Sequence, residues 1–163
     1  MADFSAVVAK VQTLATTAVA TLQGVQMHGE LDDPEFPAAH FHRGLDVSIL
    51  EADYRTGETG TNRSARPRYR RLALLLRVGY LFGREEPAVG ASVRSSFAEA
   101  TVDAHGDMDT VEAALILPTG WSGTTPAIVS IRRSGSVSVA KVPGHDLSRA
   151  LATMPVDVEV AIT

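Results

Sequence analysis

Residues 72–82, "LALLLRVGYLF", form an apolar run that is interrupted by one charged residue, Arg77. Such a run is typical of a central β-strand that is covered on both faces. Within that strand, Arg77 is expected to reach the sheet edge or to pair with an acidic side chain. Upstream, "LDVSILEADY" at residues 45–54 alternates apolar and polar positions. This alternation predicts a strand with one buried face.

The segment between these strands, residues 55–71, reads "RTGETGTNRSARPRYRR" and contains six arginines. Its glycine, asparagine and proline residues favour turns. The simplest connection is therefore a long β-hairpin arm, with the arginine-rich segment as its extended tip.

Two further segments place apolar residues three or four positions apart, which brings them onto one face of a helix. In residues 4–22 these are Phe4, Val8, Val11, Ala15, Ala18 and Leu22. In residues 92–117 they are Val93, Phe97, Ala100, Ala104, Met108, Val111 and Leu115. The second period continues through Gly106, so we predict one unbroken helix that ends before Pro118.

The remaining elements complete the predicted fold. We expect a hairpin of residues 127–133 and 137–143, a short helix at 145–154, and a final strand at 156–163 whose apolar residues alternate with Asp157 and Glu159. Residues 25–44 hold no sustained period and are interpreted as an ordered loop. The element order predicts an α+β fold in a single domain, residues 1–163, with two amphipathic helices on one face of a mainly antiparallel sheet.

Charge is distributed in blocks along the 163-residue chain, whose net charge is −4. Residues 1–54 and 85–126 each carry a net −6, whereas residues 55–84 carry +7. Blocks of opposite sign suit contact with another copy, or with a partner of opposite charge, better than general polyanion binding. The absence of cysteine excludes disulfides and thiolate metal sites. No apolar run approaches the ~20 residues of a membrane-spanning helix.

Catalytic motifs are weak. "GETGTNRS", residues 57–64, lacks the lysine of a phosphate-binding loop, and "GWSGT", residues 120–124, lacks the second glycine of a nucleophile elbow. His40 and His42 could form a metal site with Glu35 or Asp46, but hydrogen bonding to the backbone or a place in an interface is the preferred interpretation. We therefore expect no enzyme, cofactor or metal. If the protein were nevertheless an enzyme, the alternative hypothesis is a small enzyme whose site is built around His40, His42 and Asp46.

The arginine-rich segment is the strongest functional feature of the sequence. Its six arginines are the predicted contact residues for an acidic neighbouring subunit or assembly partner: Arg55, Arg63, Arg66, Arg68, Arg70 and Arg71. The alternative is a nucleic-acid-binding module, in which these arginines contact phosphates and Tyr69 stacks on a base. A hairpin tip whose charges are solvated is a third interpretation. The acidic balance of the chain favours this one and the subunit contact over nucleic-acid binding.

The order of elements resembles that of the tail-terminator proteins of long-tailed bacteriophages. The resemblance is carried by the helices at residues 4–22 and 92–117, the strand pair 45–54 and 72–82, and the closing "PVDVEVAIT" at 155–163. The additional segment 130–143 and the long 25–44 loop depart from the compact form of that family. These departures leave another head–tail connector or neck protein as an alternative.

The resemblance implies a structural virion protein that forms a ring, typically of six copies, at the head-proximal end of the tail. Such a ring ends polymerisation of the tail tube and joins the tail to the head connector. The implied partners are other copies of the chain, the tail-tube protein and the connector protein, with double-stranded DNA only in transit through the lumen and no membrane. The implied locations are the virion and, during assembly, the host cytoplasm.

Overall fold

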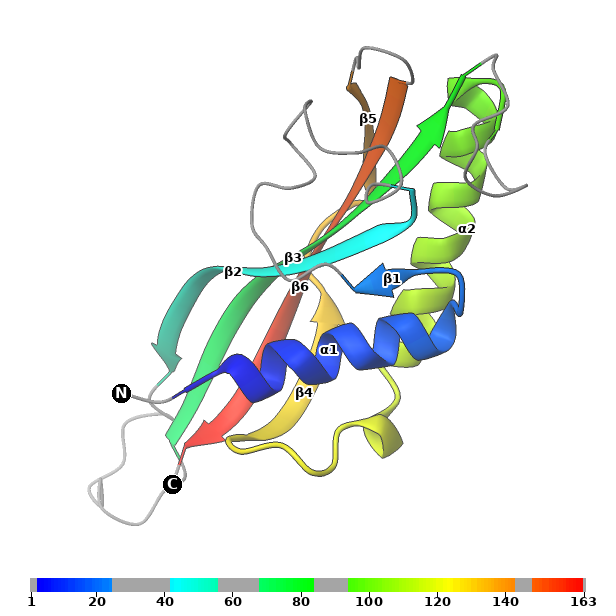
Figure 1. Ribbon diagram of the computed structural model, residues 1–163. Helices are drawn as coiled ribbons and strands as arrows, with labels where there is room; N and C mark the ends of the chain where they lie inside the picture. Colours follow the sequence, from blue (N-terminus) through cyan, green and yellow to red (C-terminus); the bar gives the residue numbers. More distant parts are fainter. Residues whose placement is uncertain (1–2, 25–41, 56–67, 84–93, 143–147, 163) are drawn as a thin grey trace.

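The computed structural model describes residues 3–24, 42–55, 68–83, 94–142 and 148–162 (Figure 1). The elements follow the chain as α1 (Ser5–Ala18), β1 (Gln23–Gly24), β2 (Gly44–Arg55), β3 (Arg68–Phe82), α2 (Phe97–Leu115), the 3-10 turn η2 (Pro118–Gly120), β4 (Ala127–Arg133), β5 (Ser138–Val142) and β6 (Ser148–Ile162). The predicted α+β class is therefore confirmed. Neither of the described α-helices combines the length and the apolar character of a membrane span.

A single sheet holds all six strands in the order β1-β2-β3-β6-β4, and β5 also pairs with β6. Among the described strands, the short β1–β2 pairing is parallel and the other four pairings are antiparallel. The central pair, β3 and β6, stays in register from Arg68 opposite Ile162 to Phe82 opposite Ser148. Figure 1 shows these two long strands twisting through the middle of the molecule. The sheet is thus mainly antiparallel, as predicted.

Alternate residues of β3 and β6 form the floor of the hydrophobic core. The fully buried side chains on this face are Leu72, Leu74, Leu76, Val78, Tyr80, Ala150, Ala152, Met154, Val156, Val158 and Val160. Both helices pack against them, α1 through Val7, Val11 and Ala15 and α2 through Ala100, Ala104, Met108, Val111 and Leu115. We call this side of the sheet the core face. The other side, which carries Arg71, Ala73, Asp157 and Glu159, is the open face.

The predicted period of α2 is confirmed from Ala100 to Leu115, and Gly106 lies within the continuous helix. The helix begins later than predicted, at Phe97, because Ser96 caps it: its Oγ accepts the Glu99 N–H at 3.3 Å. Helix α1 ends at Ala18, earlier than predicted, although Leu22 is still buried in the core.

The predicted short helix at residues 145–154 is wrong for the part that the structure describes, because β6 begins at Ser148. Two alanines and a leucine at residues 150–152 suit a helix by local propensity and obscure the alternation of a strand. Pairing with β3 overrides this propensity, and Ala150 and Ala152 are buried on the core face.

The predicted hairpin of residues 127–133 and 137–143 is also wrong in its pairing. Both strands exist as β4 and β5, but each pairs with β6 instead of with the other. β6 is long enough to accept β5 along Arg149–Thr153 and β4 along Val156–Ala161 on the same edge. β4 and β5 are therefore neighbours in the sequence but do not pair with each other; each pairs with a different part of β6.

Strand β3 is central, as predicted, but its two faces differ. From Arg71 to Arg77 buried and half-buried residues alternate, and consecutive residues are buried only from Val78 to Phe82. The expected acidic partner of Arg77 is Asp46, opposite it on β2: Nη2 and Nε lie 2.7 and 3.3 Å from Oδ2. Because Asp46 is only 3% exposed, this charge-assisted pair is needed to neutralise a buried carboxylate.

Truncating the floor of the core should destabilise the fold strongly. Leu74 is fully buried, so Leu74→Ala should lower the free energy of unfolding by about 2–5 kcal/mol through lost burial and a residual cavity. Leu117 is 56% exposed, and Leu117→Ala should change it by no more than about 0.5 kcal/mol. Urea unfolding followed by circular dichroism measures both values. Equal values for the two variants would contradict the assigned core.

Candidate interaction surface

The paired part of the hairpin extends into the arginine-rich segment. Strands β2 and β3 remain paired up to Arg55 opposite Tyr69, so the last residues of the predicted tip belong to the sheet. Arg63 and Arg66 lie outside the described residues, as do the side chains of Arg55 and Arg68. Whether residues 56–67 extend the arm stays a prediction.

The two arginines that follow in β3 point to opposite faces of the sheet. On the core face, the guanidinium of Arg70 lies 4.8 Å from the centroid of the Phe4 ring, a cation–π contact at the start of α1. On the open face, Arg71 Nη1 lies 3.7 Å from Asp157 Oδ2. Two of the six predicted contact residues therefore already contact other parts of this chain.

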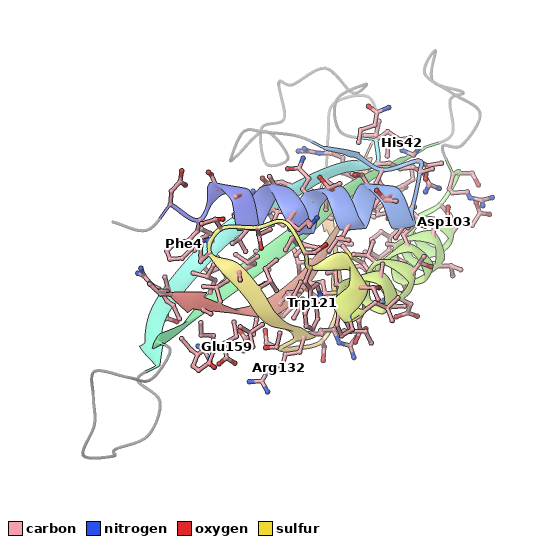
Figure 2. All side chains as sticks on the ribbon, turned by 90° about the horizontal axis from the view of Figure 1, so that it is seen from below. Phe4, His42, Asp103, Trp121, Arg132 and Glu159 are labelled. Atoms are coloured by element: carbon pink, nitrogen blue, oxygen red, sulfur yellow. The ribbon has the colours of Figure 1, made fainter. Side chains whose placement is uncertain are left out.

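The open face carries charges of both signs at the arm end of the sheet. Asp157 lies between Arg71 and Arg132, whose Nη2 is 4.0 Å from the same Oδ2. Figure 2 shows Arg132 and Glu159 on the side of the sheet away from α1. No described helix packs on this side, and ion pairs at such distances on partly exposed side chains contribute little stability. The charges can therefore exchange these contacts for contacts with a partner.

A second polar cluster lies at the other end of the sheet. Arg43 Nη1 donates to Thr21 Oγ1 at 3.0 Å and to Asp107 Oδ2 at 2.8 Å. The Tyr80 hydroxyl donates to the same Asp107 oxygen at 2.7 Å, and Asp103 accepts from Arg94 at 2.8 Å. The cluster joins the chain after α1, the turn before β2, β3 and α2. These contacts hold both helices to the sheet.

The backbone at Arg43 is part of this arrangement. Its φ of 58° is in the left-handed region, which a non-glycine residue seldom adopts. Its N–H donates to Gly79 O at 2.6 Å, and its carbonyl accepts the Gln23 N–H at 2.9 Å. The tight turn thus links β1 to β3 and directs the guanidinium towards Asp107.

The proposed metal ligands do not assemble in the part of the chain that is described. His40 and Glu35 lie outside it, and Asp46 is paired with Arg77. His42 Nδ1 accepts the Leu81 N–H at 3.2 Å, so His42 bonds to backbone, in agreement with the preferred interpretation. Burial, followed by the charge of Arg43, lowers the pKa of His42. Among the described residues, no group of three or more His, Asp or Glu side chains is placed to hold a metal ion.

Sequence patterns did not reveal this second polar cluster, which we call the Arg43 cluster and which consists of Thr21, Arg43, Tyr80, Arg94, Asp103 and Asp107. Its members come from five separate places in the chain, and no spacing connects Thr21, Arg43, Tyr80 and Asp107. The one local signal was Asp103 and Asp107, four residues apart and therefore on one side of α2.

The Tyr80–Asp107 hydrogen bond should make stability fall at high pH. Burial, followed by this hydrogen bond, raises the pKa of Tyr80 in the folded state, so its contribution is complete below the ordinary value near 10 and is lost as the pH rises above it. At pH 7, Tyr80→Phe should lower the free energy of unfolding by about 1.5–3 kcal/mol. The difference between the two proteins should shrink above pH ~10, measured by urea unfolding at a series of pH values. A difference that does not change with pH would contradict this assignment.

No protein-family model matches this chain, and no curated protein shows significant similarity to it.

Proposed function

We propose that this protein is a structural subunit that joins further copies of itself into a ring at the head-proximal end of a phage tail. In this role the ring ends tail-tube polymerisation and joins the tail to the head connector. The supporting observation is that both described α-helices pack on the same face of the sheet, while the open face carries charges of both signs near the base of the hairpin. Function then resides in surfaces that bind other subunits.

The distribution of charge supports contact between unlike surfaces. Ring subunits make heterologous contacts, in which one surface meets a different surface of the next copy. On the open face, Asp157 and Glu159 lie close to Arg71 and Arg132 in the sheet register. A surface of mixed sign is suited to a partner with the complementary arrangement, and such matching governs specificity.

The nucleic-acid alternative has less support from the described arginines. Strand alternation sends Arg70 to the core face and Arg71 to the open face, where each has an intrachain contact. A phosphate-binding groove needs several guanidinium groups on one surface. The proposal therefore assigns the arginine-rich segment to protein contacts, with DNA only in transit.

Ring formation is the direct test of the proposed function. Native mass spectrometry and negative-stain imaging of the purified protein should show one discrete closed oligomer, expected to be a hexamer. Added tail-tube protein should bind to the ring. A strictly monomeric protein at high concentration, also in the presence of tail-tube protein, would overturn the proposal.

DNA binding separates the two candidate functions. We expect the natural protein to bind double-stranded DNA weakly or not at all at physiological salt. The same result is expected for a variant in which glutamine replaces Arg63, Arg66, Arg68, Arg70 and Arg71. The measurement is fluorescence anisotropy across a salt series. Tight binding that falls steeply with salt and is lost in the glutamine variant would support the nucleic-acid module instead.

A further inference from the structure

Two strand edges of the sheet have no partner among the described residues. β1 ends at Gly24, opposite Leu45; from Val47 onward no described strand pairs with the outer edge of β2, and β4 forms the opposite edge of the sheet. Each of the two strands has one register shift, and the residue at that shift, Leu50 or Val129, is 62% or 42% exposed. Unpaired backbone groups along an edge are a template for another strand.

The directions of these strands fit a head-to-tail contact. Three successive antiparallel pairings connect β2 to β4 through β3 and β6, so β2 and β4 run in opposite directions. A second copy, rotated about an axis along the strands, can therefore add its β2 antiparallel to β4 of the first. Repetition of this step continues the sheet from copy to copy and closes when the rotation closes.

One row of directly opposed residues supplies the charges for such a contact. Glu51, Ala73, Asp157 and Arg132 lie opposite one another across β2, β3, β6 and β4. The row begins with an exposed carboxylate at one edge and ends with a guanidinium that is 65% exposed at the other. Both side chains belong to the open face, as two residues paired across strands must.

Charge also selects between the possible pairings of edges. Charged residues and bulges at a strand edge usually prevent pairing with other chains. Here the charges differ in sign: β4 carries Arg132 and Arg133, whereas β2 carries Glu51. Contact of β4 with another β4 brings like charges together, while contact of β2 with β4 brings opposite charges together.

We propose that neighbouring copies join through these edges, with β2 of one copy added antiparallel to β4 of the next and Glu51 beside Arg132. The occupant of each edge is thus a second copy of this chain. The inference rests on the proposed self-association and specifies the surface through which it occurs. It also predicts that the row from Glu51 to Arg132 continues from subunit to subunit.

Cysteine cross-linking tests this contact cleanly, because the natural chain has no cysteine. Directly opposed residues in an antiparallel pair have Cα atoms about 4.5–5.5 Å apart, within the range that a disulfide bridges. A mixture of the Glu51→Cys and Arg132→Cys variants should give disulfide-linked heterodimers under mild oxidation. The variant with both substitutions should give a ladder of covalent multimers that ends at the ring size.

Val102→Cys is the matched control, because Val102 is 72% exposed on α2, away from both edges. Mixed with Arg132→Cys, it should give far less heterodimer than Glu51→Cys does. Equal yields from the two mixtures would overturn the proposal. Rings that form without the Glu51–Arg132 cross-link would overturn the edge contact and leave the proposed function intact, whereas a monomer under all conditions would overturn both.

Charge reversal gives an independent readout in the same protein. Glu51→Arg and Arg132→Glu should each weaken assembly about tenfold or more, because each places like charges side by side. The double variant Glu51→Arg/Arg132→Glu restores opposite charges and should recover most of the loss, as measured by analytical ultracentrifugation. Unchanged assembly of the single variants, or a double variant weaker than both of them, would contradict the contact. Circular dichroism confirms that each variant is folded.

Discussion

The antiparallel pairing of β3 with β6 is the interaction on which the rest of the structure depends. It runs without a register shift from Arg68 opposite Ile162 to Phe82 opposite Ser148. β2 adds to the free side of β3, β4 and β5 add to the free side of β6, and both helices pack on the face that the two strands share. A slip of one residue would exchange the faces of one strand, placing charged side chains such as Asp157 against the helices. The alternation of valine and acidic residues in β6 therefore fixes the register.

The sequence predicted local features of this arrangement well and partner choice poorly. Helix α2 was identified from its apolar period, and β2 and the end of β6 were identified from the alternation of apolar and polar residues. These patterns arise because burial of one face places apolar residues at regular intervals in the sequence. The same method failed at Ala150 and Ala152, whose small side chains suit a helix until β3 lies beside them. Partner choice is non-local, which is why the pairing of β4 and β5 with β6 was missed. For Arg77, an acidic partner was one of the two outcomes predicted, but its identity as Asp46 required the register.

Strand alternation also changes what the arginine-rich segment means. In the sequence, Arg70 and Arg71 belong to one basic block, but in β3 they lie on opposite sides of the sheet. One stabilises the start of α1 through Phe4, and the other belongs to a charged surface with Asp157. At the other end of the sheet, the Arg43 cluster fixes the helices, so the charged surface is presented by a well-supported sheet.

The position of β6 in the chain has a consequence for the newly made protein. β6 pairs with β3, β4 and β5, yet it is synthesised after all of them. At translation rates of about 5–20 residues per second, several seconds or more pass between the synthesis of the aliphatic strand β3 and that of β6. During that time the edge of β3 that β6 later covers is open, and such an apolar edge is a target for aggregation and a ligand for chaperones. The demand on the folding machinery of the cell that makes the protein is thus set by the order in which the ribosome synthesises the strands.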